Sequence, residues 1–471
     1  MLPSTQCDTA PRLAGRDPTD DHDPAVDALV SRAVAAQRSF ATWPEAQVDA
    51  LLHDIAKCIA EHAEELAVAT VAETGFGNVP DKILKNRLAS QMVYQSLAGK
   101  PATGLLRMDA ETGIAEFASP VGVVFGVLPK TNPVATFVFK VLIALKARNA
   151  VILSCHRDAQ RVGQRTGDLI TAVLKQHATP AGLVQWNQRR ADRRTTLQLM
   201  RHPDVAFILA TGAAGVVRAA YSSGTPAIGV GAGNAPTWVC ADADLDQVAQ
   251  AVVASKSFDN GIMCASEHNL VVDGAIRPAF LEALEWHGAA VLREYEIDRF
   301  VAAVFESGDD AHVRSELLGQ SAPRLLEAAG LNRAGAVRLV VVPARRHQIT
   351  GPLGREKLAP VTSLFTVDGD EEGFAICHSL LANEGAGHTA IIHSADSERI
   401  ARFGREMPAS RILVNAPGAQ GTLGMESGLP PSLTVGCGTF GGTSTTDNVT
   451  FTHLLNIKRL AYRTLPVRAA A

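Results

Sequence analysis

Cys264 lies in the stretch DNGIMCASEHN, residues 259–269, and a thiol in this setting could act as a nucleophile. A lone cysteine can also pack as a small hydrophobic side chain, which is its commonest role, or bind a metal ion. A metal site would use His268, but two ligands do not make a site, so none is expected. The neighbours are small, and the stretch falls between a predicted helix (244–257) and the predicted strand NLVVDG. A loop of this kind favours the nucleophile.

Glu267 and His268 follow the thiol closely. Either side chain could take a proton from a thiol, and either could instead be a polar residue at the edge of the next strand. A general base must lie within hydrogen-bond reach of its proton, and the sequence favours the strand-edge role because it gives no such geometry.

Asn132 lies in LPKTNPVATF, where a predicted strand turns into a helix. At the carboxyl end of a parallel strand, its amide could donate to an oxyanion. The alternative is a helix N-cap before Pro133 at the first helical position, and asparagine is a favoured cap. The local sequence by itself favours the cap.

Two further segments carry groups that could meet a nucleotide. IGVGAGNAP (228–236) has glycines that permit close backbone approach, but it lacks the G-x-G-x-x-G spacing that opens a nucleotide-binding helix. SCHRDA (154–159) ends a predicted strand with Ser154, His156 and Arg157. These groups could contact a ribose or a phosphate, or they could simply face solvent.

The segments around these residues alternate between strand and helix patterns. VGVVFGVLP (121–129) and NAVILSCH (149–156) predict strands, and residues 133–148 between them have helical length and spacing. Strand, helix and strand within about 35 residues match a parallel crossover unit. Earlier helices are predicted at residues 24–40, 45–72 and 81–98.

We therefore expect an α/β protein with two Rossmann-like, doubly wound α/β domains, whose carboxyl strand ends commonly hold nucleotides. RMDAETGIAEFASP (107–120) predicts a hairpin, which would leave the domain as a small β-arm beside the strand-like HLLNIKRLAY. Such an arm cannot fold alone, so we expect a homo-oligomer, a homodimer or homotetramer. The expected division is a flexible lead-in (1–24), a cofactor-binding domain (25–106 and 120–235), a catalytic domain (236–430), and an oligomerisation arm with a terminal strand (107–119 and 445–471).

The composition disfavours several functional classes. The chain has 471 residues, a net charge of −4 and evenly spread charges, which gives no sign of a nucleic-acid groove or a basic membrane patch. Seven irregularly spaced cysteines favour a reduced protein over a disulfide framework. The most apolar region, residues 119–153, is interrupted by lysines and prolines, and the N-terminus lacks the apolar core of a signal peptide. A cytoplasmic location is expected.

The order of the motifs resembles the aldehyde dehydrogenase superfamily from about residue 24 to the end. The shared features are Asn132 after a strand, ATGAAG at another strand end, GVGAGNAP, Cys264 and REKLAPV. CASEHN, EGAGHTAIIHS and GCGTFGG followed by HLLNIK are similar to the coenzyme A-acylating branch, and within it the chain looks closest to acylating sulfoacetaldehyde dehydrogenases. The resemblance implies an enzyme that acts on a small aldehyde with NAD or NADP and coenzyme A.

The resemblance also implies roles for individual residues. Cys264 is the nucleophile and Asn132 the oxyanion amide, and the carboxylate for the adenosine ribose falls on Glu356. Ser154 stands at the strand end where the hydrolytic branch usually has a ribose-binding lysine. The other positions implied at the cofactor are Pro129, His156, Arg157, Thr211, Gly212 and Gly231. Because Arg157 could neutralise a 2′-phosphate, NADP is as open as NAD.

Two residues are expected at the substrate, His388 and Arg87. The segment around Arg87 resembles the helix that borders the substrate entrance, where a guanidinium would suit an anionic aldehyde such as sulfoacetaldehyde. Alternatively, Lys85 and Arg87 face solvent or pair with Asp81.

One departure from the family pattern concerns water. Hydrolytic aldehyde dehydrogenases carry a glutamate as general base where this chain has Val230, 34 residues before Cys264. A valine cannot activate water, so a thioester on Cys264 would wait for a better nucleophile, such as a thiol. We also expect the pKa of Cys264 to lie below the free value of about 8.5. The alternatives are a hydrolytic enzyme with another base and a non-catalytic scaffold of the same fold.

Overall fold

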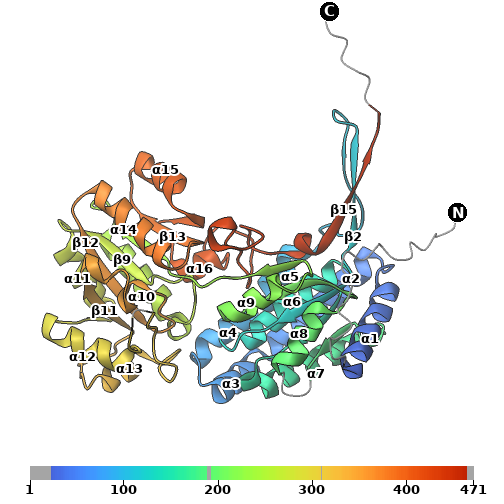
Figure 1. Cartoon of the computed structure of the whole chain (residues 1–471), viewed down its shortest axis with the longest axis horizontal. Coiled ribbons are helices and arrows are strands. Elements are labelled where there is room, and N and C mark those ends of the chain that lie inside the picture. Colours follow the sequence, from blue (N-terminus) through green and yellow to red (C-terminus); the bar gives the residue numbers. More distant parts are fainter. Residues whose placement is uncertain (1–22, 188–191, 309, 464–471) are drawn as a thin grey trace, which may run out of the picture.

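The computed structural model describes residues 23–187, 192–308 and 310–463, which form two α/β lobes and a projecting β-arm (Figure 1). Most of the predicted lead-in and the end of the predicted terminal segment, residues 464–471, lie outside the described residues. Within the described ranges, no helix is both long and apolar enough to span a bilayer.

A five-stranded parallel sheet forms the first lobe, in the order β5-β4-β3-β6-β7. All of β3 and β4 is buried, as parallel strands covered by helices on both faces must be. The strand order reverses between β3 and β6, and nucleotides bind at the carboxyl strand ends at such a point. The strands are β3 (Val123–Val127), β4 (Ala150–Ser154), β5 (Val184–Trp186), β6 (Val205–Ala210) and β7 (Ala227–Gly229).

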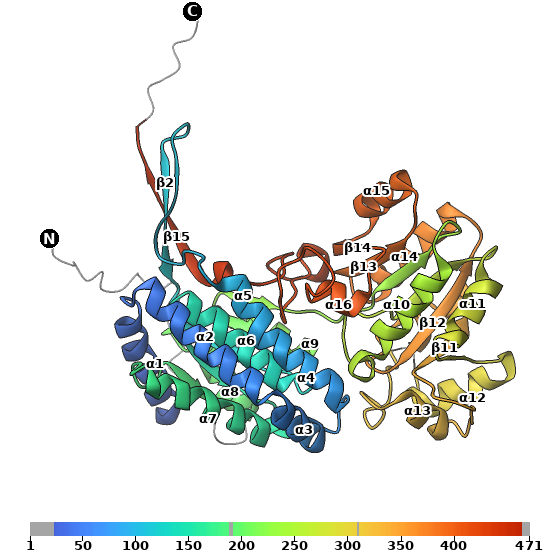
Figure 2. The same ribbon diagram turned by 180° about the vertical axis from the view of Figure 1, so that it is seen from behind.

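Helices cover this sheet in two layers on one face. Helices α6 and α7 lie on that face under an outer layer of α2 to α5, and α1, α8 and α9 pack on the opposite face (Figure 2). The predicted helix 45–72 is two helices, because the backbone leaves helical geometry at His62, whose ring Nδ1 contacts the Cys58 carbonyl at 2.8 Å. The bounds are α1 (Pro24–Phe40), α2 (Glu45–Glu61), α3 (Ala63–Thr74), α4 (Val79–Arg87), the π-helix η1 (Leu88–Met92), α5 (Val93–Leu97), α6 (Pro133–Lys146), η2 (Arg157–Ala159), α7 (Gln160–Gln176), α8 (Arg193–Arg201) and α9 (Ala214–Tyr221).

A seven-stranded parallel sheet forms the second lobe, in the order β10-β11-β12-β9-β8-β13-β14. The core on one face lies under α10 and α11, and the cores on the other lie under α12 to α15. The strands are β8 (Pro236–Val239), β9 (Asn269–Asp273), β10 (Ala289–Val291), β11 (Leu339–Ala344), β12 (Val361–Val367), β13 (Gly387–His393) and β14 (Ala409–Val414). The helices are α10 (Leu245–Ser257), η3 (Phe258–Gly261), α11 (Arg277–Trp286), α12 (Glu294–Val304), α13 (Ala322–Ala328), η4 (Arg346–Gln348), η5 (Pro352–Gly354), α14 (Asp370–Asn383), α15 (Ser397–Glu406), α16 (Gly418–Thr422), η6 (Thr439–Gly441) and η7 (Phe451–Leu454).

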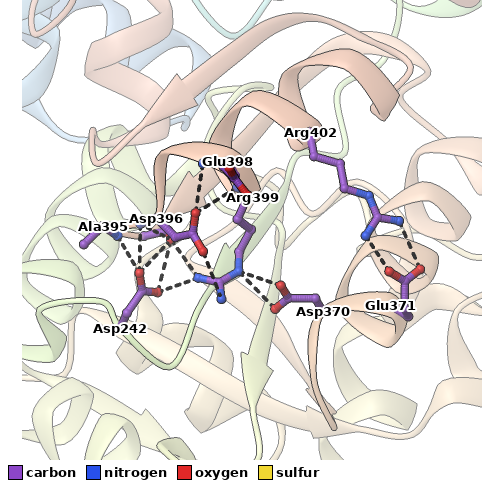
Figure 3. Close-up of polar contacts among 9 residues, drawn as sticks. Asp242, Asp370, Glu371, Ala395, Asp396, Glu398, Arg399 and Arg402 are labelled. Carbon is purple, nitrogen blue, oxygen red and sulfur yellow. Dashed lines mark hydrogen bonds and ion pairs between the residues drawn. The ribbon is translucent and has the colours of Figure 1, made fainter.

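Arginines of α15 connect that helix to its surroundings (Figure 3). Arg399 lies 2.9 Å from Asp242, in the loop after β8, and 2.9 Å from Asp370, at the start of α14. Arg402 pairs with Glu371 and stacks over the Phe374 ring. These contacts hold the first turns of α14 and α15 against the sheet.

The third sheet is the arm, in the order β1-β2-β15. The predicted hairpin is present as β1 (Gly104–Asp109) and β2 (Ile114–Pro120), and β15 (Leu455–Ala461) pairs antiparallel with β2. The arm projects from the first lobe (Figures 1 and 2). Strand β1 is mostly exposed, so the arm has little core of its own.

Candidate active site

Two loops meet where β8 and β9 begin, and one of them carries Cys264. Asn269 at the start of β9 pairs with Pro236 at the start of β8, and its N–H donates to the Ala235 carbonyl at 3.3 Å. A Cβ on Gly233 would lie 1.8 Å from the Cys264 carbonyl oxygen. The GVGAGNAP segment therefore needs a glycine at position 233 in order to pack against the loop that carries Cys264, here called the nucleophile loop.

The backbone just before Cys264 is held in an uncommon conformation. Asp259 (φ 51°), Asn260 (φ 54°) and Gly261 (φ 71°) are all left-handed, which side-chain-bearing residues adopt only when their surroundings impose it. The Asn260 amide donates to the carbonyls of Gly77 and Gly319, at 3.0 and 2.9 Å. The surrounding structure thus fixes the turn that presents Cys264.

The Cys264 thiol is not activated in this structure. Cys264 is partly exposed, but desolvation, together with the nearby Glu356 and Cys437, raises the pKa of its thiol to about 12. The predicted lowering of this pKa is therefore wrong. At neutral pH a thiol with this pKa is protonated.

His268 holds the nucleophile loop and does not act as its base. Its Nδ1 accepts the Lys357 backbone N–H at 2.9 Å and lies 3.0 Å from the Lys256 ammonium. The ring N–H must then be on Nε2, which donates to the Cys264 carbonyl at 3.1 Å. Burial and Lys256 hold the pKa of His268 well below its usual value, so the ring stays neutral.

Glu267 is hydrogen-bonded to the start of α16. Its Oε1 accepts the Gly418 N–H at 2.6 Å, at the start of α16, and burial raises its pKa to about 7. The contacts of Glu267 and His268 therefore favour the role of polar residues that hold the structure over the role of a base for the thiol.

Asn132 takes the N-cap position of α6, but its side chain does not cap the helix. Its Oδ1 instead accepts a hydrogen bond from Lys85 Nζ at 2.8 Å. The predicted N-cap position before Pro133 is confirmed, but the side chain makes no capping hydrogen bond, and the Nδ2 group is left with one long contact of 3.4 Å to Thr131 Oγ1. This amide is available to donate to a ligand.

Arg87 is not brought together with these residues. It is exposed and lines an outer groove with His53, Glu61 and Tyr94. Two positions along an α-helix turn by about 200°, so Arg87 and the inward Lys85 lie on opposite sides. Lys85 is 1% exposed and pairs with Asp259, so it neither faces solvent nor pairs with Asp81.

Glu356 lies at the nucleophile. Its Oε1 accepts the Gly233 N–H at 2.9 Å, and Gly233 packs on the Cys264 carbonyl. Burial, with Glu384 as the second cause, raises the pKa of Glu356 to about 8. This position favours contact with the reacting end of a cofactor, and the predicted role at the adenosine ribose stays a prediction.

Four of the residues predicted at the cofactor gather at one sheet edge. Val127, the last residue of β3, pairs with Ser154 on one side and with Ala210 on the other. Pro129, Ser154, Thr211 and Gly212 therefore lie at the carboxyl ends of β3, β4 and β6, where the strand order reverses. Thr211 Oγ1 is buried and has no hydrogen-bond partner among the described residues, which suits a ligand contact.

The remaining cofactor candidates lie around the same edge. The Val230 N–H donates to the Ala210 carbonyl at 3.2 Å, which brings Gly231 beside β6. His156 and Arg157 follow β4, where the His156 ring accepts the Asp158 N–H and Arg157 lies 3.6 Å from the Asp158 carboxylate. The Asp158 carboxylate therefore sits beside the guanidinium that a 2′-phosphate would use.

Arg411, which was not predicted as a site residue, links His388 to the glycine-rich segment GCGTFGG (436–442). Arg411 donates to the His388 and Gly436 carbonyls at 2.7 and 2.6 Å. His388 is fully buried, its Nδ1 contacts Thr389 Oγ1, and its Nε2 has no partner within the described ranges. Burial raises the pKa of Cys437 as well, so the pKa does not separate the two thiols, but Cys437 is buried whereas Cys264 is partly exposed.

Some residues at the site carried a signal in the sequence and others did not. Lys82 and Lys85 are three positions apart on one helix face, so a shared contact could have been considered. Asp259, which pairs with both, is 174 residues from Lys85 in the chain. Only the fold shows that the three side chains meet.

Comparisons with known proteins support the fold and the family. The aldehyde dehydrogenase family model matches residues 17–298. The bifunctional aldehyde-alcohol dehydrogenase of Escherichia coli K12 is 36% identical over 443 residues, which are 93% of this chain and 49% of that protein, so the chain spans about half of its length. The acylating sulfoacetaldehyde dehydrogenase of Cupriavidus necator is 39% identical over 442 residues, covering 93% of this chain and 89% of that protein.

A solved structure gives the same result. The acetylating aldehyde dehydrogenase of Geobacillus thermoglucosidasius is 36% identical and superposes with a TM-score of 0.89, over 95% of this chain and 98% of that chain. The predicted fold class is thereby confirmed. The chain belongs to the aldehyde dehydrogenase family, in the branch that contains its acylating members.

Proposed function

We propose that the chain oxidises a short aldehyde to its acyl-CoA, reversibly, through a thioester on Cys264. The observation that carries this proposal is the apolar Val230 at the position where hydrolytic relatives have their general base. The buried carboxylate of Glu267 accepts the Gly418 N–H through Oε1, which ties it to the start of α16. A thioester formed here would therefore persist until a thiol attacks it.

The chemistry requires two residues at the reacting carbon. The Cys264 thiol loses its proton and its sulfur forms a bond to the aldehyde carbon, and the carbonyl oxygen becomes an oxyanion that accepts a hydrogen bond from Asn132 Nδ2. NAD or NADP, when bound, supplies the hydride acceptor that turns the adduct into a thioester. The coenzyme A thiol then loses its proton and bonds to the acyl carbon, and the Cys264 sulfur leaves.

The first lobe is proposed to bind the cofactor and the second to carry the nucleophile. The residues at the β3–β6 edge fit a dinucleotide, because Thr211 Oγ1 is buried without a partner in the described structure and Gly212 follows it directly. Asp158 beside Arg157 would oppose a 2′-phosphate, while the guanidinium would attract it. Both NAD and NADP therefore stay in the proposal.

The substrate is proposed to be a short aldehyde. Sulfoacetaldehyde is among the candidates, because the acylating sulfoacetaldehyde dehydrogenase of Cupriavidus necator is similar over nearly the whole chain. Arg87 gives no support for an anionic substrate, since it lies in the outer groove. His388, with its buried Nε2 free among the described residues, is the better candidate for a polar contact with the substrate or coenzyme A.

The test is reduced-cofactor absorbance with neutral and anionic short aldehydes, each with and without coenzyme A, for the wild type and Cys264→Ala. We expect sustained turnover only with coenzyme A and none in the variant. Equal turnover without coenzyme A would favour the hydrolytic alternative, for which Glu356 is the buried carboxylate beside the nucleophile. Cofactor binding without any turnover would favour the scaffold.

We also propose that the chain is a homodimer or homotetramer and is cytoplasmic. The β-arm supports the oligomeric state. It has little core of its own, and its exposed apolar side chains are those of Leu105, Met108, Leu460 and Tyr462.

A further inference from the structure

A buried ionic cluster joins helix α4, the Asn132 turn and the loop that carries Cys264. Asp259 Oδ2 lies 2.5 Å from Lys85 Nζ and 2.7 Å from Lys82 Nζ. Lys85 also donates to Asn132 Oδ1 at 2.8 Å, and Lys82 donates to the Thr131 carbonyl at 2.5 Å. The side chains of both lysines and of Asp259 are at most 3% exposed.

The contact with Lys85 fixes which way the Asn132 amide faces. An ammonium group only donates hydrogen bonds, so it selects the amide oxygen and leaves the NH₂ group turned away from it. The opposite amide orientation would place an N–H against the ammonium and lose the charge-assisted hydrogen bond. Because Asn132 does not cap its helix, Lys85 is the strong contact that decides the orientation.

Asp259 connects this amide to the nucleophile loop. Its Oδ1 accepts the Asn78 N–H at 3.0 Å, and its own N–H donates to Asp81 at 2.6 Å, so it is held from both ends by α4 and the turn before it. Asp259 opens the left-handed run that leads to Cys264. A Cβ on Gly77 would lie 1.8 Å from its carboxylate, which leaves the side chain little freedom to move.

We propose that Lys85 is a positioning residue, which orients the Asn132 amide toward the reacting carbonyl oxygen while Asp259 ties that amide to the loop of Cys264. The proposal rests on the proposed function in one respect, namely that Asn132 stabilises an oxyanion formed at Cys264. A purely structural role for the cluster is the competing explanation, and it would affect every reaction of Cys264 alike.

The test compares two reactions of the same thiol. With p-nitrophenyl acetate, the Cys264 sulfur bonds to the acetyl carbon through an oxyanion, the ester C–O bond breaks, p-nitrophenolate leaves, and the thiol proton goes to solvent. With iodoacetamide, the sulfur displaces iodide from an sp³ carbon and no oxyanion forms. Neither reaction needs coenzyme A or a nicotinamide cofactor. Only the first reaction should depend on the Asn132 amide.

We expect Asn132→Ala to slow ester acylation by about 10²–10³-fold, as for the loss of one oxyanion donor, and Lys85→Met to slow it by about 10–10²-fold. Lys85→Met in the Asn132→Ala background should add less than about threefold, because both changes remove the same interaction. Alkylation by iodoacetamide should change by less than about threefold in Lys85→Met, since the oxyanion is not involved. Asp259 keeps Lys82 as a partner in this variant, so its charge stays paired.

Lys82→Met is the matched control, because it removes a lysine from the same carboxylate but not from the Asn132 side chain. Its effect on ester acylation should be about tenfold smaller than that of Lys85→Met. Equal losses in the two variants, additive losses in the double variant, or a parallel loss of alkylation would overturn the positioning role. So would an ester reaction that persists in Cys264→Ala. If the wild type lacks coenzyme A-dependent turnover but shows the coupled losses, the proposed function fails and the positioning role stands.

Discussion

Glu356 is the residue whose charge most directly opposes ionisation of Cys264. After desolvation, it is the largest cause that raises the pKa of the thiol to about 12. Its own pKa is about 8, so it carries its charge throughout the range in which the thiol titrates. A neutral side chain of the same shape at position 356 would therefore lower the pKa of Cys264.

We predict that Glu356→Gln increases the rate of Cys264 alkylation by iodoacetamide between about pH 8 and 10, because more thiolate is present at each pH when the opposing charge is gone. The glutamine oxygen can still accept the Gly233 N–H, so the loop is kept. The measurement is the pH profile of alkylation, with Cys264→Ala to subtract other thiols. An unchanged or upward-shifted profile would contradict the electrostatic role of Glu356.

At this scale, the sequence singled out Cys264 and Asn132, whose catalytic roles stay predictions, but not the residues that hold them. Cys264 could be singled out as a thiol in a loop between two elements, whereas the role of Asn132 came from the resemblance to the family, because its local sequence favours a helix cap. The Lys85–Asp259 ion pair and the hydrogen bond from Arg411 to the Gly436 carbonyl join groups that only the fold brings together. The ionisation of Cys264 was mispredicted for the same reason, since it is decided by burial and by Glu356, a carboxylate that is remote in the sequence but near in the fold.

Among the elements, α15 depends on Arg399 for its placement. The guanidinium bridges Asp242 after β8 and Asp370 at the start of α14 (Figure 3), and the Arg399 side chain is 18% exposed. These contacts join three elements that also share the core under Trp238 and Phe403.

We predict that Arg399→Met lowers the free energy of unfolding by about 1–3 kcal/mol, because it leaves two carboxylates without their shared cation. Arg405→Met, at an exposed position on the same helix, should change it by less than about 0.5 kcal/mol. Urea unfolding followed by circular dichroism measures both. Equal stability of the two variants would show that helix packing alone places α15.

The elements themselves were largely predictable, and the exceptions have local causes. Period 3.6 in α1 and buried β-branched runs in β3 and β4 gave the right segments. The break at His62 was missed, because the apolar pattern continues through it into α3. The π-helical turn η1 was missed as well, since it interrupts a helix without changing which residues are apolar.

For the molecule as a whole, the β-arm is the feature from which we expect a homo-oligomer. Both β1 and β15 are edge strands of a three-stranded sheet, and unpaired edges normally have to be covered. Leu105, Met108 and Leu460 are about half exposed there, so a second copy could cover both the edge and the apolar side chains.

We predict that light scattering after size-exclusion chromatography gives two or four times the monomer mass at micromolar concentration. Leu105→Lys combined with Leu460→Lys should shift the protein toward the monomer, because two buried ammonium groups would have to be desolvated at the interface. Trp286→Lys is the control, since Trp286 is 85% exposed at the end of α11 and away from the arm (Figure 1), and it should leave the mass unchanged. A wild-type monomer would remove the reason for the arm's exposed side chains, and a mass that falls equally in the control would place the interface elsewhere.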